Sequence, residues 1–355
     1  MRDLTAELRK WHAADKDYAV ATVIGVTGSA PRPPGAALAV DADGIVIGSI
    51  SGGCVEGAVY ELCREVLRTG QPVRETFGYS DDDAFAVGLT CGGELEVFVQ
   101  PITAVERVAI EAILRTDEPV ALVRNLKTGA AMAIGSWWTV GAAFDGPVVV
   151  EARAMLDIGA TGKREIGCGA DEVTVFVESY VPPPRMIVFG AIDFAAAVTR
   201  IGRFLGYHVT VCDARPVFAT HARFPDADEI VVQWPDRYLA RTQVDSRTVL
   251  CVLTHDAKFD IPLLEVALRL PVAYVGAMGS RRTHEDRMAR LRAAGMTESE
   301  LAQLHSPIGL DLGARTAEET AVSVAAEIVA IRRGGSAQPL TATGGPIHRD
   351  LLPVW

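Results

Sequence analysis

The second half of the chain alternates between strand-like and helix-like segments, and this alternation restricts the fold more than any other feature. The strand-like segments are short and apolar; they are Met186–Phe189, Val209–Cys212, Ile230–Gln233, Val249–Leu253 and Val272–Val275. Helical patterns fit the stretches between and after them, at Asp193–Leu205, Ile261–Leu270, Arg281–Ala294 and Thr316–Arg333. This βαβ series predicts a Rossmann-like, doubly wound parallel sheet of about five strands, with helices on both faces.

A proline triplet marks the boundary between this region and the first part of the chain. Val181-Pro182-Pro183-Pro184 separates two strand-like segments, as a linker does. We therefore predict an α/β protein with an N-terminal mixed α+β domain at 1–181, the Rossmann-like domain at 185–334 and a tail at 335–355. The sequence shows no internal repeat, and the stretch from Arg115 to Tyr180 reads mainly as strands with glycine turns.

Charge and composition argue against several classes of partner. The 355 residues carry a formal net charge of -11, which opposes sequence-independent binding to nucleic acid or to an anionic membrane. The longest central stretch without charge, Ala130–Phe144, is shorter than the ~20 residues that a membrane-spanning helix needs. The first ten residues lack an apolar leader-like core, so we expect a cytoplasmic protein whose six cysteines are thiols.

The motif Ser51-Gly52-Gly53-Cys54-Val55-Glu56-Gly57 joins a strand-like run to a helix-like run at Ala58–Leu67. Glycines at such a junction let backbone N–H groups approach a ligand, and the free N–H groups of a helix start attract anions. The same field favours the thiolate form of a cysteine. Gly52 and Gly53 are therefore a candidate anion cradle and Cys54 a candidate reactive thiol. The alternative is a tight turn with a small buried cysteine.

A second glycine-flanked cysteine, in Cys91-Gly92-Gly93, precedes an alternating strand. Because Cys54 and Cys91 both lie beside Gly-Gly pairs, we hypothesise that their loops face each other in one pocket. Between Thr27 and Gly35, three prolines stiffen a loop that carries Arg32, a side chain suited to phosphate or carboxylate. The alternative for Arg32 is a solvated loop residue.

The first turn of the Rossmann-like region departs from the dinucleotide-binding pattern. That pattern is G-x-G-x-x-G/A, whereas this turn reads Gly190-Ala191-Ile192-Asp193. A branched side chain and a carboxylate at the phosphate position oppose pyrophosphate binding. Asp213 nevertheless ends the next strand, where a ribose-binding acid belongs. The position of Asp213 thus favours NAD(P) binding at Gly190 and Asp213, whereas Ile192 and Asp193 in the turn oppose it.

Two later strand ends carry polar residues. His255 and Asp256 follow the fourth strand and suit a proton-transfer pair or metal ligands; the alternative is a capping or core role. Gly279, Ser280 and Arg281 follow the fifth strand and open a helix, which makes them a candidate phosphate cradle. Ligands of open α/β sheets bind outside the carboxyl ends of the strands, so we expect these groups to share one edge.

Several motifs, in one order along most of the chain, resemble those of the XdhC/CoxI family. They are G-S-A-P-R-P-P-G at 28–35, S-G-G-C-V-E-G at 51–57, C-G-G-E-L-E-V at 91–97, R-F-P-D-A-D at 223–228, T-H-D at 254–256, Y-V-G-A-M-G-S-R-R at 274–282 and P-I-G-L-D-L-G-A at 307–314. The stretch from about 115 to 170 carries little of the resemblance. At Ile192 and Asp193 the chain departs from the more glycine-rich turn of many relatives.

The resemblance implies an accessory protein, more a cofactor-handling chaperone than a turnover enzyme. It implies binding of the molybdenum cofactor, a phosphorylated pterin dithiolene, and help with its sulfuration and insertion into a molybdenum hydroxylase such as xanthine dehydrogenase. A cysteine desulfurase as a further partner and a homodimeric state are also implied. The residues carried over as cofactor-site candidates are Arg32, Gly52, Gly53, Cys54, Cys91, Gly92 and Gly93.

Two other functions stay open at this point. One is an NAD(P)-dependent oxidoreductase that uses Asp213 and His255. The other is a scaffold that only docks a hydroxylase, with structural glycine–cysteine loops.

Overall fold

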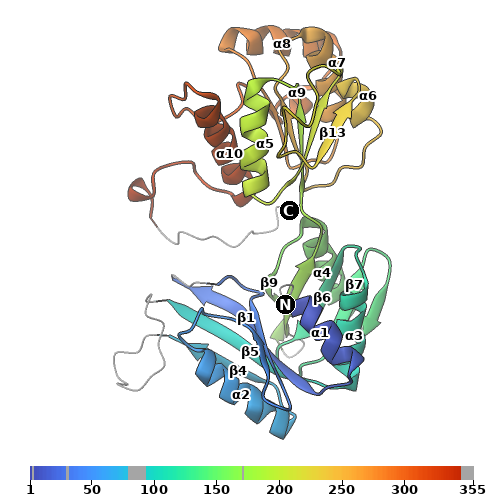
Figure 1. Ribbon diagram of the computed structural model, residues 1–355, viewed down its shortest axis with the longest axis vertical. Helices are drawn as coiled ribbons and strands as arrows, with labels where there is room; N and C mark the ends of the chain where they lie inside the picture. The colour runs from blue at the N-terminus through green and yellow to red at the C-terminus, as the bar shows by residue number, and fades with distance from the viewer. Residues whose placement is uncertain (2–3, 29–31, 79–92, 170–171, 345–355) are drawn as a thin grey trace. The chain divides into compact units, whose positions relative to one another are not determined.

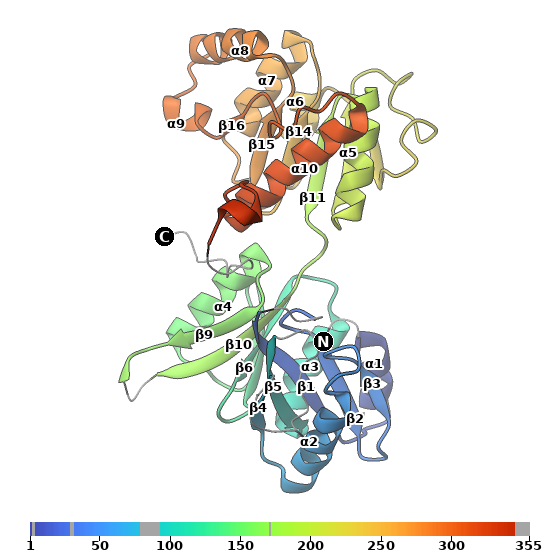
Figure 2. The same ribbon diagram turned by 90° about the vertical axis from the view of Figure 1, so that its left-hand side faces the viewer.

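The computed structural model describes residues 1, 4–28, 32–78, 93–169 and 172–344. The chain divides into two compact units, Met1–Pro182 and Pro183–Trp355, which are treated separately below (Figures 1 and 2). In the part of the chain so described, no helix combines the length and the apolar character needed to cross a bilayer.

The described residues of the first unit form two antiparallel sheets of five strands each. The first sheet has the order β3-β2-β1-β5-β4. Its strands are β1 (Tyr18–Thr27), β2 (Ala37–Asp41), β3 (Val46–Gly48), β4 (Val73–Phe77) and β5 (Glu94–Ile102). The second sheet has the order β8-β7-β6-β10-β9. Its strands are β6 (Val120–Asn125), β7 (Ala131–Gly135), β8 (Thr139–Gly141), β9 (Gly162–Ile166) and β10 (Val173–Tyr180).

These two sheets have the same topology, which the sequence did not indicate. Each half runs through three strands, a helix and two more strands, with α2 (Glu56–Thr69) and α4 (Gly146–Ile158) in the equivalent places. The strand registers match as well: Thr22 pairs with Ala37 and Phe98, and Arg124 pairs with Ala131 and Phe176. The first unit is therefore a structural duplication.

Two glycines show how closely the halves correspond. Gly48 and Gly141 lie at equivalent positions of β3 and β8 and have positive φ angles of 85° and 108°. A Cβ added at Gly48 would lie 2.4 Å from the carbonyl oxygen of Ala37, and one added at Gly141 would lie 2.5 Å from that of Ala131. Both positions require glycine for the same backbone reason.

The apolar residues of the first unit fall into layers. Helices α1 (Thr5–Ala13) and α3 (Ala104–Arg115) pack with one face of each sheet in a shared core. Val59, Cys63 and Val66 of α2 cover the other face of the first sheet, and α4 covers the other face of the second (Figure 1). The equivalent Phe98 and Phe176 meet in a small central cluster.

Helix α4 was not expected, because 115–180 reads mainly as strands. The three consecutive valines at 148–150 favour a strand by propensity. Val148, Ala152 and Met155 are nevertheless buried with helical spacing, and Gly159 ends the helix in the left-handed region. Burial of this stripe against the second sheet overrides the local preference.

The second unit is a six-stranded sheet of parallel strands in the order β13-β12-β11-β14-β15-β16, which confirms the predicted fold class. The strands are β11 (Arg185–Phe189), β12 (His208–Asp213), β13 (Glu229–Val232), β14 (Val249–Val252), β15 (Tyr274–Ala277) and β16 (Leu304–His305). The prediction of about five strands missed β16. With only two residues, it has no readable periodicity.

Helices cover both faces of this sheet (Figure 2). One core joins alternate strand residues to α5 (Asp193–Phe204) and α10 (Ala317–Arg333). The other core joins the intervening residues to the remaining helices. These are α6 (Pro235–Leu239), α7 (Ala257–Ala267), α8 (Arg281–Ala293) and α9 (Glu298–Leu301). Beyond α10 the described chain ends with a short 3-10 helix, Leu340–Ala342.

Candidate functional site

The start of α2 is built around the carboxylate of Glu56. This carboxylate accepts hydrogen bonds from the backbone N–H groups of Ser51 (3.0 Å), Gly52 (2.9 Å) and Gly53 (2.8 Å). The hydroxyls of Ser49 (2.7 Å) and Ser51 also donate to it. The N–H groups of the predicted anion cradle therefore already surround an anion that the chain itself supplies.

The charge of Glu56 is strongly stabilised by this arrangement. Burial alone would disfavour the charged form, but the hydroxyls of Ser51 and Ser49 and the neighbouring backbone N–H groups lower the pKa of Glu56 to about 2. The turn before α2 is thus held in one conformation at neutral pH by a permanent internal carboxylate.

Cys54 stands directly after this turn and two residues before α2 begins. Cys54 is half-buried, whereas Cys63, which lies within α2, is fully buried. Gly52 and Gly53 are exposed, with positive φ angles of 79° and 127°, and a Cβ added to either would meet no atom within 4 Å. A bulky ligand can therefore approach the backbone at these glycines and the sulfur beside them.

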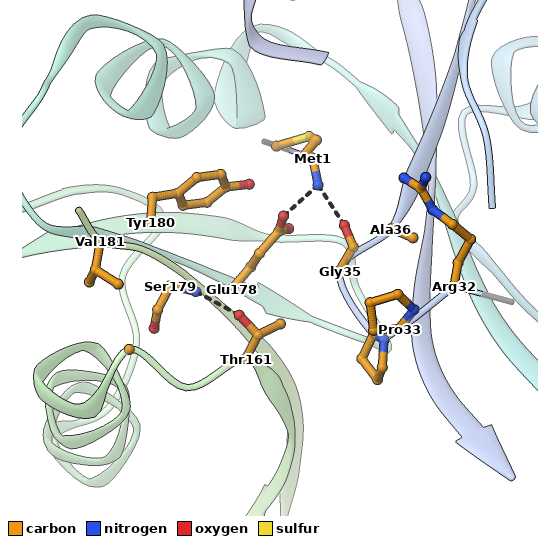
Figure 3. A pocket seen from close by; sticks show the side chains of 12 residues that line it. Met1, Arg32, Pro33, Gly35, Ala36, Thr161, Glu178, Ser179, Tyr180 and Val181 are labelled. Carbon is orange, nitrogen blue, oxygen red and sulfur yellow. Dashed lines mark hydrogen bonds and ion pairs between the residues drawn. The ribbon is translucent and has the colours of Figure 1, made fainter. Parts of the chain in front are cut away.

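Arg32 lies on a different feature, a cavity in the first unit that is here called the junction pocket (Figure 3). Its volume is about 500 Å³, within the range typical of ligand sites. One wall is the loop 32–36, and the other consists of Gly159, Thr161 and residues 178–181. Arg32 is half-buried there.

Glu178, which lines the junction pocket, belongs to a buried ion pair. Glu178 is 5% exposed, and its Oε2 lies 3.0 Å from Nη2 of Arg124, which is 1% exposed. The Met1 amino group donates to Glu178 Oε1 and to the carbonyl oxygen of Gly35, each at 2.6 Å (Figure 3). Although burial disfavours its charge, these two cations hold the pKa of Glu178 below its ordinary value.

The second predicted thiol is not placed by the structure. Cys91 and Gly92 lie outside the described residues, whereas Gly93 is buried directly before β5. The hypothesis that Cys54 and Cys91 share one pocket therefore stays a prediction.

In the second unit, Asp213 reaches the first turn, but its oxygens are already engaged. It accepts from the N–H of Ala191 at 2.7 Å and from the backbone and guanidinium of Arg215 at 2.8–2.9 Å. Burial opposes its charge, yet these donors hold the pKa of Asp213 below its ordinary value. Gly190 has φ 104°, and an added Cβ would lie 3.0 Å from the backbone nitrogen of Thr254. The turn is closely packed rather than open.

A small hollow of about 240 Å³ lies beside this turn. Arg215 and Arg223 stand over the ring of Phe218, and Arg223 also pairs with Asp193 at 3.2 Å. The carboxylates of Asp213 and Asp193 thus compensate both guanidinium groups. This arrangement does not favour a dinucleotide phosphate.

Two of the five predicted residues at the later strand ends act as helix caps. The Asp256 side chain accepts from the N–H of Lys258 at 3.1 Å and caps α7, and Ser280 accepts from the N–H of Thr283 at 3.1 Å and caps α8. His255 and Arg281 are exposed. The cap at Asp256 also explains why α7 begins at Ala257, earlier than the predicted Ile261.

Sequence reasoning missed a buried ion pair beneath these caps. The Arg287 guanidinium donates to Asp260 Oδ2 (2.9 Å), to the Met278 carbonyl oxygen (2.8 Å) and to Ser306 Oγ (2.9 Å). The Thr254 hydroxyl donates to Asp260 as well. Arg287 therefore ties α7 to the loops after β15 and β16, and Asp260 links it to Thr254 after β14. Its helix is otherwise strongly polar, so no apolar stripe pointed to a buried arginine.

Among the described residues, no group of three His, Cys, Asp or Glu side chains is arranged to hold a metal ion.

Two family models match the chain. One, described as the XdhC and CoxI family, matches residues 11–78, and the other, described as the XdhC Rossmann domain, matches residues 186–328. A Bacillus subtilis protein, named as a probable xanthine dehydrogenase subunit, is 29% identical over 329 residues, covering 90% of this chain and 94% of that protein. "Molybdenum cofactor insertion chaperone PaoD" of Escherichia coli is 26% identical over 317 residues, covering 89% and 84%.

A solved structure is similar over nearly the whole chain. It is a crystal structure described as a xanthine dehydrogenase from Bacillus halodurans, with a TM-score of 0.65 and 25% identity. The match covers 96% of this chain and 97% of that one. The sequence matches and the common fold confirm the resemblance drawn from the motifs, and the chain belongs to the XdhC and CoxI family.

Proposed function

We propose that this chain is an accessory protein that binds the molybdenum cofactor and helps its insertion into a molybdenum hydroxylase of the xanthine dehydrogenase type. The names of the two curated relatives support an accessory role of this kind. The cofactor is cargo in this proposal, and the chain's own task is to bind it, shield it and release it.

The observation that carries the proposal is the open turn beside Cys54. Gly52 and Gly53 leave free space where any other residue would place a Cβ, and Cys54 presents a half-buried thiol next to that space. Glu56 holds the turn by accepting hydrogen bonds from three backbone N–H groups. Soft thiolate sulfur is a suitable ligand for the metal of such a cargo. The turn therefore offers access and a ligand together.

The finer parts of the function remain part of the proposal. They are the sulfuration step, a cysteine desulfurase as the source of its sulfur, a thiol role for Cys91, a homodimer and a cytoplasmic location. An NAD(P)-dependent oxidoreductase is the less favoured alternative, since Asp213 is engaged by Ala191 and Arg215. A scaffold that only docks a hydroxylase is the other alternative.

Molybdenum retention tests the proposal. Full-length protein is mixed with cofactor released from a hydroxylase, separated from free cofactor by gel filtration and analysed for molybdenum by mass spectrometry. We expect retention by the wild type, a clear loss in Cys54→Ala and no loss in Cys168→Ala. Cys168 is a suitable control because it is an exposed thiol of the first unit that lies after β9, away from the turn before α2 in the sequence.

Absence of retention by the wild type would overturn the proposed function. Undiminished molybdenum retention by Cys54→Ala would show that the Cys54 thiol is not part of the binding site. Hydroxylase activation that is insensitive to both cysteine substitutions, without cofactor retention, would support the docking scaffold instead.

A further inference from the structure

The duplication in the first unit creates two equivalent junctions between its halves, and one of them is closed. There, Nε2 of Gln100 from the first half donates to the carbonyl oxygen of Gly129 from the second half at 3.3 Å. A Cβ added at Gly129 would lie 3.5 Å from the ring of Pro72. A short connection, residues 125–130, and a neutral amide therefore seal this junction.

The other junction has the same backbone plan with different chemistry. Glu178 pairs with Leu122 as Gln100 pairs with Val20, so a carboxylate stands where the closed junction has an amide. Gly35 precedes Ala37 as Gly129 precedes Ala131, and Ala37 and Ala131 are equivalent in register. A carboxylate has no N–H to donate to the Gly35 carbonyl, and the Met1 amino group bridges the two instead.

The connection at this second junction is also longer. Residues 23–36, rather than 125–130, join the equivalent positions Thr22 and Ala37. Residues 32–36 of this connection form one wall of the junction pocket. The same fold thus provides an internal comparison, in which a cavity of about 500 Å³ has replaced direct packing.

The groups that line the junction pocket define a ligand chemistry. A carboxylate has about four acceptor positions, and Met1, Arg124 and the Tyr180 hydroxyl all bond to Glu178. Glu178 can therefore accept from about one further N–H group. Arg32 lies beyond Gly35 on the other side of the pocket, where it suits a phosphate (Figure 3).

We propose that the junction pocket binds an aminopyrimidinone heterocycle carrying a phosphomonoester, with the N–H edge on Glu178 and the phosphate on Arg32. The phosphorylated pterin of the cargo has this chemistry, so the inference rests on the proposed function. It assigns the pterin end of the cofactor to this pocket, apart from the thiol turn at Cys54.

The experiment uses a probe without metal or dithiolene, the fluorescent pterin phosphate obtained by oxidising the cofactor. Its binding to full-length protein is measured by fluorescence titration. We expect Arg32→Gln to weaken binding at least about tenfold, because a hydrogen bond to a charged group contributes that much. Arg153→Gln, in an exposed arginine of α4, is expected to bind as the wild type does. The dephosphorylated pterin is expected to lose its dependence on Arg32.

A second variant keeps the proposal testable if the loop is perturbed. Thr161→Phe fills the pocket from the opposite wall and is expected to weaken pterin phosphate binding by a similar factor in protein that circular dichroism shows to be folded. Equal affinities of the wild type, Arg32→Gln and Thr161→Phe would overturn the proposal, as would no binding by the wild type at millimolar probe.

Two further arms separate the possible failures. If molybdenum retention depends on Cys54 while the pocket variants change nothing, the pocket is wrong and the proposed function stands. If neither molybdenum nor pterin phosphate is retained, both fail. Guanosine 5′-monophosphate has a similar donor edge and a phosphate; tighter binding of this nucleotide than of pterin phosphate would overturn the assignment to the cargo.

Discussion

The two halves of the first unit share strand order and register but differ in nearly every connection. In the first half, residues 28–36 join β1 to β2 and residues 49–55 join β3 to α2; the equivalent connections in the second half are residues 126–130 and 142–145. The family motifs before the Pro triplet lie in the first half. We infer that the duplicated sheets are scaffold, and we propose that ligand contacts come from the longer connections of the first half together with Thr161 and Glu178 of the second half.

The starts of α2 and α4 show the same contrast. Before α2, the carboxylate of Glu56 gathers three backbone N–H groups and leaves an open glycine turn beside Cys54. Before α4, the described Asp145 accepts no side-chain cap hydrogen bond, and Pro147 occupies the first turn. The turn before α2 is therefore organised by hydrogen bonds to a carboxylate, whereas α4 begins with a proline in its first turn, as many helices do.

The largest effect on the free energy of unfolding is expected from Glu178→Gln, which makes the two junctions of the first unit more similar. Glu178→Gln gives the junction pocket the amide of its counterpart but leaves the Arg124 guanidinium buried without its carboxylate. Breaking one side of a buried pair costs about 3–5 kcal/mol, so we expect the free energy of unfolding of the first unit to fall by about that amount. Denaturant unfolding followed by hydrogen exchange measures the change.

The matched control for this substitution is Glu165→Gln, in an exposed residue of β9. It should change the free energy of unfolding by less than about 0.5 kcal/mol. A loss of under about 1 kcal/mol in Glu178→Gln would show that the two junctions are energetically equivalent.

A smaller, local effect is expected at Glu56. A carboxylate whose pKa is depressed by folding contributes stability that is complete above its unfolded-state pKa and lost as pH falls through its folded-state pKa. The turn before α2 should therefore weaken between about pH 4.5 and 2. The amide proton shifts of Gly52 and Gly53 should titrate with a midpoint near pH 2, and this titration should vanish in Glu56→Gln. A midpoint near 4.5 would contradict the assigned hydrogen bonds.

The smallest effect is expected in the second unit, at a predicted site residue that the structure uses as a cap. Asp256→Ala removes the cap of α7 and should lower the free energy of unfolding by about 1 kcal/mol. Because the cap lies outside the proposed cargo site, molybdenum retention should stay at the wild-type level. A marked loss of molybdenum retention, in protein of nearly unchanged stability, would indicate that the cargo site includes the Rossmann-like unit.

The sequence predicted the second unit well because buried parallel strands read as short apolar runs between helical periods. Met186 and Val188 face one core while Ile187 and Phe189 face the other, so both faces demand apolar residues. The first unit was harder to predict. Its duplication rests on strand order and register, which only long-range pairing reveals, and the valines at 148–150 concealed α4.

The candidate site was predicted in part. The motifs placed Gly52, Gly53 and Cys54 at a helix start, where the structure has them. They did not show that Glu56 fills the cradle, because that depends on the path of the turn. Nor did they indicate the junction pocket, half of which comes from Thr161 and other residues in or beyond a stretch with little motif content.

Hydrogen exchange of the full-length protein with and without bound cofactor tests the central claim most directly. We predict slower exchange at Gly35 and Ala36, around Thr161 and through residues 49–57, and unchanged exchange at residues 190–193, 254–256 and 279–281. Protection confined to those three strand ends of the second unit, with none in the first, would contradict the account.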